Sequence, residues 1–183
     1  MSAHEVSERE LILCVGDTTY LDYGSIKAKW DGYGPQGNGG NGLLLHSGLA
    51  VCPDNGQPLG LLWQKLWNRE HRAQPPSDET PSQKKKRQAN ERKAKRERPF
   101  DQKESYRWVE AMEQTETNVS ATTRLIHIFD REGDIAKVFA HLKENTQTGM
   151  VVRASHNRAL EHDPNRLWPK LEGQPIVDRK SVV

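Results

Sequence analysis

Two aspartates each follow directly on an apolar run. Asp17 comes after residues 11–15, and Asp130 comes after residues 125–129. Continuous apolar runs of this length are typical of strands that are buried on both faces. If the two strands lie side by side and parallel, both carboxylates reach one edge of the sheet. Carboxylates held on rigid strands suit Mg²⁺, with Mn²⁺ as a substitute, because these cations prefer oxygen ligands. Taken alone, Asp17 is better explained as a turn residue that caps nearby backbone amides.

Positive charge is concentrated in one segment. Nine of the 27 Lys and Arg residues, but only two of the 25 Asp and Glu residues, fall in residues 84–98, so the rest of the chain has a net charge of −5. A clustered basic segment favours a polyanionic partner, and its candidate DNA contacts are Lys84, Lys85, Lys86 and Arg87. The alternative is a solvated, charged linker, because no aromatic residues alternate with the cations for base stacking.

Other features narrow the class of protein. Cys14 and Cys52 lie in apolar runs without metal-ligand spacing, which predicts reduced core thiols in a cytoplasmic protein. His46 lies in the middle of a predicted strand, where a structural role is favoured over a metal ligand. No apolar stretch approaches the ~18 residues that cross a membrane, so we expect no membrane partner.

The elements that must position the two aspartates follow from the periodicity. Strands are predicted over residues 10–15, 43–52, 59–67, 124–129 and 150–155, with helices over 104–112 and from 135 onward. Residues 68–103 contain Pro75, Pro76 and Pro81 before the basic run, so we expect a disordered or weakly helical excursion there. Asp134 is placed to be the N-cap of the helix that follows it.

This order predicts an α/β fold, a mixed sheet flanked by helices. A three-strand start followed by alternating helices and strands fits the ribonuclease-H-like architecture. In that architecture the first and fourth long strands are adjacent and parallel, which would bring Asp17 and Asp130 together.

The motifs at these positions resemble a known family. Asp17-Thr18-Thr19, the segment Lys103–Trp108, the motif Asp130-Arg131-Glu132-x-Asp134 and the segment Val151–His156 occur in matching order. They are similar to the DDE-type cut-and-paste transposases of bacterial insertion sequences, the group that includes the transposon-five enzyme. The resemblance covers roughly residues 10–70 and 100–160, and it implies DNA transposition and recombination as the function.

The resemblance implies a role for each matching residue. Asp17 and Asp130 would be the catalytic, metal-binding aspartates, and Arg153 and His156 would lie near the active-site edge, where they contact DNA. Two Mg²⁺ ions would clamp the oxygens of an in-line displacement. The partners would be double-stranded transposon ends and a second subunit of a homodimer. Glu132 and Asp134 belong to the motif, but we expect them to have structural roles at the strand-to-helix turn.

One departure from the family is prominent. Its third carboxylate belongs to a Tyr-x-x-Arg-x-x-x-x-x-x-Glu pattern that these 183 residues lack. The expectation is therefore a catalytic-core fragment, incomplete at its C-terminus and inactive alone. Its parts would be three core strands, the basic insertion, the remaining core units and the start of a further region, in residues 1–67, 68–103, 104–160 and 161–183.

Two alternatives remain open. The chain could be a non-catalytic DNA-binding or inhibitory transposase remnant that uses residues 84–98 to contact phosphates. It could also be a different ribonuclease-H-like nuclease, such as a resolvase. That reading needs a third carboxylate, for which the candidates are Glu144, Glu161, Asp163 and Glu172.

Overall fold

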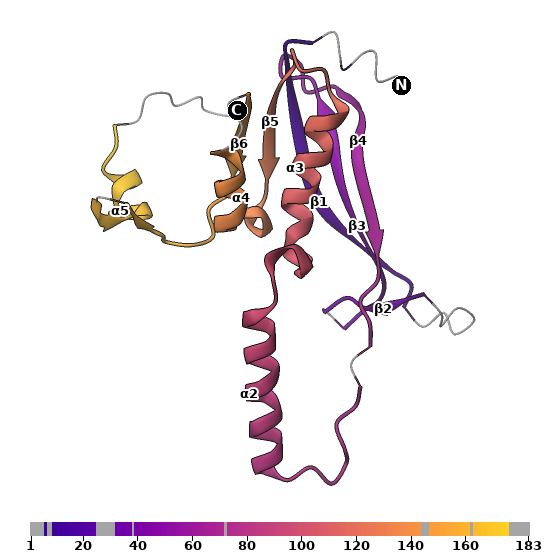
Figure 1. Ribbon diagram of the computed structural model, residues 1–183. Coiled ribbons are helices and arrows are strands. Elements are labelled where there is room, and N and C mark those ends of the chain that lie inside the picture. The colour runs from indigo at the N-terminus through magenta and orange to yellow at the C-terminus, as the bar shows by residue number, and fades with distance from the viewer. Residues whose placement is uncertain are drawn as a thin grey trace.

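The longest strand, β1 (Leu11–Asp22), lies at the centre of a mixed sheet in the computed structural model (Figure 1). The structure describes residues 6, 9–24, 32–37, 39–71, 73–143, 147–161 and 163–175. β1 pairs antiparallel with β3 (Asn41–Val51), which pairs antiparallel with β4 (Pro58–Trp67) and with the two-residue β2 (Gly34–Pro35). On its other side β1 pairs parallel with β5 (Arg124–Phe129), and β5 pairs parallel with β6 (Thr148–Val152). The predicted α/β class and mixed sheet are confirmed.

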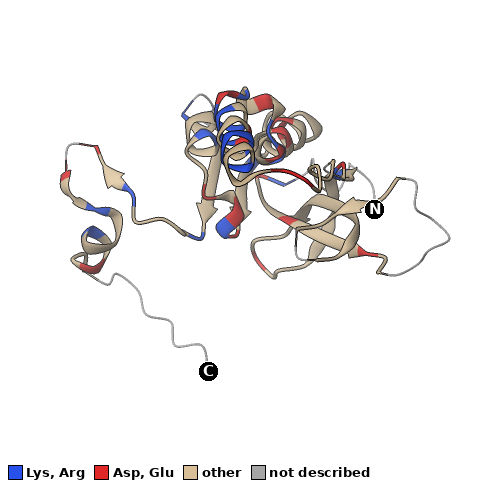
Figure 2. Cartoon of the chain, turned by 90° about the horizontal axis from the view of Figure 1, so that it is seen from below, with Lys and Arg blue, Asp and Glu red and all other residues tan. Residues whose placement is uncertain are grey.

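The basic segment forms a regular helix, α2 (Pro81–Glu97), where composition predicted a disordered or weakly helical excursion. Local signals explain the difference. Thr80 and Gln83 form a capping box with Pro81 at the first helical turn, and Arg87 bonds Glu91 one turn later. In Figure 2, the Lys and Arg positions of this helix are the blue parts of its ribbon. Because none of its residues is buried, α2 contributes nothing to the core.

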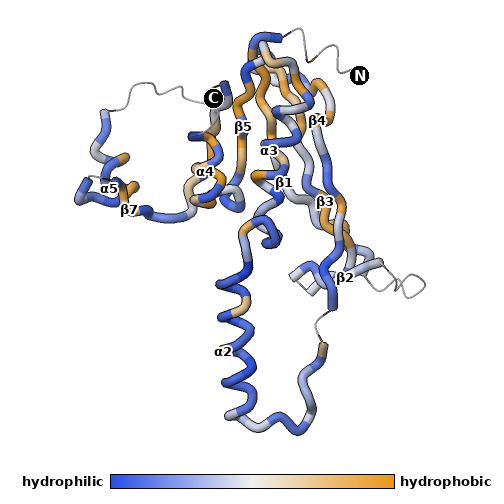
Figure 3. Tube along the Cα trace, in the orientation of Figure 1, coloured by the Kyte–Doolittle hydropathy of each residue, from blue (hydrophilic) through white to orange (hydrophobic). Residues whose placement is uncertain are grey.

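The core lies between the sheet and two helices, α3 (Arg107–Asn118) and α4 (Ala136–Leu142). Figure 3 shows the hydrophobic strands beside the hydrophilic α2. Trp108, Val109 and Met112 of α3 pack with Phe129 of β5 and Val138 of α4. The helical face predicted for residues 104–112 is therefore confirmed, although its first turns are the short 3₁₀ helices η1 (Phe100–Gln102) and η2 (Glu104–Tyr106).

A second cluster continues the core toward the start of β1. It includes Ile12, Cys14, Ala50, Cys52 and Leu125. Both cysteines are buried free thiols, as predicted, and burial raises the pKa of Cys14 to about 12, which keeps it protonated at neutral pH.

A small unit follows the main sheet. β7 (Ala159–Leu160) pairs with β8 (Asp163–Arg166), and the short helix α5 (Leu167–Glu172) follows. In Figure 1 this unit lies to one side of the sheet. Among the described residues, no helix combines the length and apolar character needed to cross a membrane.

Candidate active site

The register of β1 and β5 brings the two aspartates together. Leu13 pairs with Ile126, Val15 with Ile128 and Gly16 with Phe129, so Asp17 and Asp130 are the next residues along the two neighbouring strands. The parallel adjacency predicted from the element order is confirmed.

The two aspartates also share a face of the sheet. Side chains alternate along a strand, and Asp17 lies on the face opposite the buried Cys14 and Thr18. Asp130 follows the buried Phe129 at the end of β5, so the same alternation carried one residue further assigns it to that opposite face, and it is exposed. Because α3 and α4 pack against the buried face, both carboxylates are exposed on the other side.

One detail differs from the prediction that a strand ends at Asp17. β1 runs on to Asp22 because β3 continues to pair with it as far as Gly42, whereas its pairing with β5 stops at Phe129. Asp17 is therefore held by backbone pairing to Ser47 at the point where the parallel pairing ends. Such a strand interior is a more rigid support than a turn.

Beneath Asp17 lies a polar pair buried in the core. Thr18 Oγ1 is 2.8 Å from Nδ1 of His46, whose ring is packed edge-on against Trp108 and Trp63. Burial, together with the smaller effect of the nearby Arg107 cation, lowers the pKa of His46 to about 4, so the imidazole is neutral at pH 7. These contacts support the structural role predicted for His46.

Arg153 extends the site along the sheet edge. It follows β6, whose last residue Val152 pairs with Phe129, and its backbone N–H donates to Phe129 O at 3.1 Å. The Arg153 side chain is exposed, and so is that of His156 three residues later. The register thus places Arg153 beside Asp130.

Asp134 is not the N-cap of α4, contrary to prediction. The cap residue is Ile135, which offers no side-chain bond. The Asp134 carboxylate instead accepts bonds from the N–H groups of Ser155 and His156 and from the Arg158 guanidinium. These partners, which lie more than twenty residues away in sequence, attach the segment after β6 to the end of β5. The role of Asp134 is therefore structural, as expected, but its partners are distant in sequence.

Of the carboxylates proposed as a third ligand, the three that the structure describes do not form a metal-binding group with the aspartates. Glu144 lies outside the described residues, and Glu161, Asp163 and Glu172 belong to the β7–β8–α5 unit or its connections, where Asp163 pairs with Lys170 at 2.8 Å. Within the described ranges, no group of three or more His, Cys, Asp or Glu side chains is arranged to hold a metal ion. Asp17 and Asp130 nevertheless supply exposed oxygen ligands of the type Mg²⁺ prefers.

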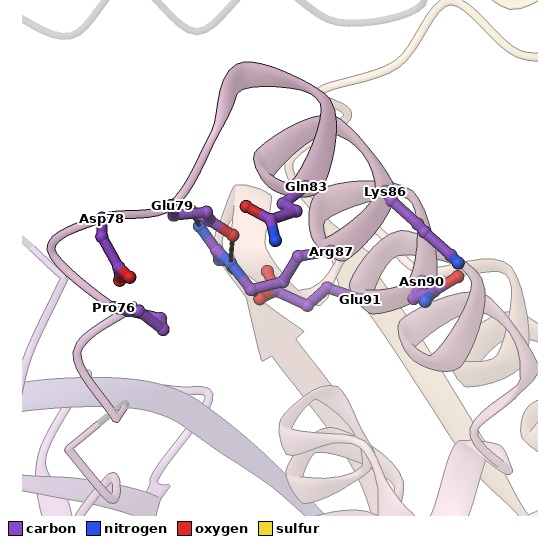
Figure 4. Close-up of a pocket in the computed structure, with 8 residues that line it drawn as sticks. All are labelled: Pro76, Asp78, Glu79, Gln83, Lys86, Arg87, Asn90 and Glu91. Atoms are coloured by element: carbon purple, nitrogen blue, oxygen red, sulfur yellow. Dashed lines mark hydrogen bonds and ion pairs between the residues drawn. The ribbon is translucent and has the colours of Figure 1, made fainter.

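The four residues of the basic segment that were expected to contact DNA, Lys84, Lys85, Lys86 and Arg87, are all on α2, which extends away from the sheet (Figure 1). Arg87 differs from the three lysines because it is held by Glu79 and Glu91, each at 2.8 Å. A shallow pocket lies between this side of α2 and the preceding segment, and Figure 4 shows Arg87 directed toward Glu79 in it. Arg87 therefore attaches the helix to its own connector.

Sequence reasoning missed Arg107, which bonds residues close in sequence to both aspartates. Its guanidinium donates from Nε to Thr18 Oγ1 at 3.1 Å and from Nη2 to Glu132 Oε2 at 2.6 Å. Thr18 follows Asp17 in sequence, and Glu132 lies two residues after Asp130. One sequence feature could have identified Arg107. It precedes Trp108 on a helix face predicted to be buried, and a buried arginine needs polar partners.

Comparison with known proteins adds no family assignment. No protein-family profile matches the chain, and no curated protein matches it significantly.

Proposed function

We propose that this chain is a ribonuclease-H-like catalytic core that binds a divalent metal ion through Asp17 and Asp130 and acts on phosphodiester bonds of DNA. The observation that carries the proposal is the register that makes these two aspartates neighbours on one exposed sheet face. The strand order β4-β3-β1-β5-β6, antiparallel in its first half and parallel in its second, supports the specific architecture.

The chain's own residues would supply binding and orientation. Asp17 and Asp130 would hold the metal ion with hard oxygen ligands, and Arg153 and His156 would contact DNA along the same edge. A bound Mg²⁺ supplies Lewis-acid activation of the attacking oxygen and neutralises charge on the phosphate. The biological process we propose is DNA transposition, with the chain as a transposase catalytic-core fragment.

We expect these 183 residues alone to cleave DNA slowly or not at all. Two carboxylates do not fix a two-metal site, and the described residues bring no third one to the pair. Robust Mg²⁺-dependent cleavage of a transposon-end duplex by this chain, lost in Asp17→Asn, would contradict that expectation.

Metal binding tests the proposal without relying on activity. Replacing Asp17 or Asp130 by asparagine should weaken Mn²⁺ binding about tenfold or more, because each variant loses one of two charged ligands. The free Mn²⁺ signal in an electron paramagnetic resonance titration measures this affinity directly.

The matched control is Asp101→Asn, which neutralises an exposed carboxylate on η1. It should leave Mn²⁺ affinity within experimental error of the unaltered chain. Equal weakening in all three variants would indicate diffuse attraction of cations to an acidic surface and would remove the support for a site at Asp17 and Asp130.

A second candidate function, non-catalytic DNA binding, is favoured by the charge distribution on α2. With about 100° between successive residues, one broad side of this helix carries seven cations and no carboxylate: Lys84, Lys85, Lys86, Arg92, Lys93, Lys95 and Arg96. The opposite side, with Gln83, Arg87 and Glu91, lines the pocket against the connector, and Lys86 lies at the border between the two sides because it also lines the pocket. Lys93 is 3.9 Å from Glu97, and the other cations of the set make the side strongly positive. A helix with one largely cationic side fits a phosphate backbone.

Neutralising part of that side should reduce the salt dependence of DNA binding. In the variant Lys84→Gln, Lys85→Gln, Lys86→Gln, we expect the slope of log K against log salt to fall by about 2–3, since each lost phosphate contact removes about 0.9. Fluorescence anisotropy with a random-sequence duplex at several salt concentrations measures the slope.

The control removes equal charge elsewhere, as Arg124→Gln, Lys137→Gln, Lys143→Gln, all exposed positions. It should change the slope by less than one. Equal slopes for the two triple variants would show that α2 is a solvated connector and not a DNA-binding element.

A further inference from the structure

Arg107 lies between the two strands that carry the aspartates. From the first turn of α3 it bonds the side chain of Thr18 on β1 and that of Glu132 just beyond β5. These two partners flank Asp17 and Asp130 in sequence. One guanidinium therefore connects the local structure around both aspartates.

The contacts of Arg107 leave it poorly placed to bind a phosphate. Its third nitrogen, Nη1, donates to the Glu104 carbonyl at 3.2 Å, so every guanidinium nitrogen has a protein partner. Its side chain is only 11% exposed, and the guanidinium carbon lies 5.4 Å from the Trp108 ring centroid and 5.8 Å from that of Trp67. Its orientation is thus fixed on several sides.

A continuous set of bonds leads from Arg107 to the Asp130 carboxylate. Arg107 holds the side chain of Glu132, and the backbone N–H of Glu132 donates to Asp130 Oδ1 at 2.8 Å. Any shift of Glu132 therefore moves a donor that orients Asp130. Toward Asp17 the connection runs through the β1 backbone, because Thr18 is the next residue on the strand and its buried side chain lies on the face opposite Asp17.

A second arginine extends the network to β4. Glu104, which precedes α3, accepts two bonds from Arg69, at 2.8 Å from Nε and 2.5 Å from Nη2. Arg69 follows the last residue of β4, and Glu104 also lies 3.8 Å from Arg107 Nη1. Alternating charges thus join the ends of β4 and β5 through the start of α3.

We propose that Arg107 is a positioning residue that sets the relative orientation of the Asp17 and Asp130 carboxylates for metal binding. This inference rests on the proposed function. Arginine suits the task because its planar fork directs separate N–H groups at Thr18 and Glu132, whereas a lysine presents one compact cation. Lysine at this position should keep the charge but lose the simultaneous contacts.

The test compares metal affinity with stability. In Arg107→Lys and Glu132→Gln, both aspartates remain, yet we expect Mn²⁺ affinity to fall about tenfold for Arg107→Lys, the scale seen when a group that orients a ligand is lost. Glu132→Gln keeps an acceptor for Arg107 and the backbone N–H, so its loss should be smaller. Electron paramagnetic resonance titration on samples shown by circular dichroism to be folded gives these affinities.

The control is Lys65→Gln. It breaks a 2.5 Å ion pair with Glu110, which lies on α3 like Arg107, but it does not remove a contact with Thr18 or Glu132. It should leave Mn²⁺ affinity unchanged. If Arg107→Lys does not fold, Thr18→Val tests the same bond from the other strand and should weaken affinity severalfold.

The outcomes separate the two proposals. If the unaltered chain shows no Mn²⁺ binding that depends on Asp17, the proposed function fails. If it does show such binding, and Arg107→Lys or its substitute Thr18→Val binds Mn²⁺ as the unaltered chain does, the positioning role fails while the site stands. Equal weakening by Lys65→Gln would also overturn that role, because any loosened α3 contact would then have the same effect.

Discussion

Trp108→Ala should lower the free energy of unfolding by about 3–5 kcal/mol, the range for truncating a large buried aromatic side chain. Trp108 is fully buried, its ring centroid lies 4.8 Å from that of Phe129 on β5 and 4.4 Å from that of His46 on β3, and it joins α3 to these two strands. The cavity would lie directly behind the candidate site. Urea denaturation followed by circular dichroism measures the loss.

Trp168→Ala provides the comparison, because Trp168 on α5 is 46% exposed. It removes the same side chain from a position outside the core and should cost less than about 1 kcal/mol, as surface substitutions usually do. Similar losses in the two variants would mean that the sheet and α3 do not form the stable core described above.

The placement of the two aspartates was predictable from sequence because it depends on local patterns and one topological rule. Apolar runs before Asp17 and Asp130 identify two strands, and the element order, three strands followed by alternating helices and strands, fits an architecture in which these two strands are parallel neighbours. The register of Gly16 with Phe129 then makes the aspartates adjacent. The apolar pattern could not predict the end of β1, because the strand continues to Asp22 through backbone pairing with β3.

The features that prediction missed depend on contacts between distant residues. Arg107 reaches Thr18 across 89 positions, and Asp134 reaches Arg158 across 24, so neither partner can be read from local spacing. α2 was missed for the opposite reason. Its composition resembles a disordered linker, while the capping box at Thr80 and the Arg87 ion pairs are local signals that outweigh composition.

Asp134→Asn should destabilise the chain by about 2–3 kcal/mol at pH 7, since it removes the charge that several donors share. Asp134 is 4% exposed, and burial alone would raise its pKa. The bonds from Ser155, Arg158 and His156 outweigh burial and hold the pKa at about 2. We expect the segment after β6 to detach from β5 in the variant, which hydrogen exchange at Ser155 and His156 would detect together with the lower unfolding free energy.

The lowered pKa of Asp134 also determines how the stability loss in Asp134→Asn depends on pH. A carboxyl whose pKa is lower in the folded chain stabilises it fully above its unfolded pKa of about 3.9. That contribution is lost as pH falls toward about 2, the pKa of folded Asp134. The stability difference between the unaltered chain and Asp134→Asn should therefore be constant from pH 7 to 5 and shrink below pH 4, as urea denaturation at each pH would show. Asp101→Asn, at an exposed position, should show little difference at any pH. If the stability difference between the unaltered chain and Asp134→Asn stayed constant down to pH 2.5, the charge of Asp134 would not be what holds this segment. The shape of the Asp134 side chain would then account for the effect.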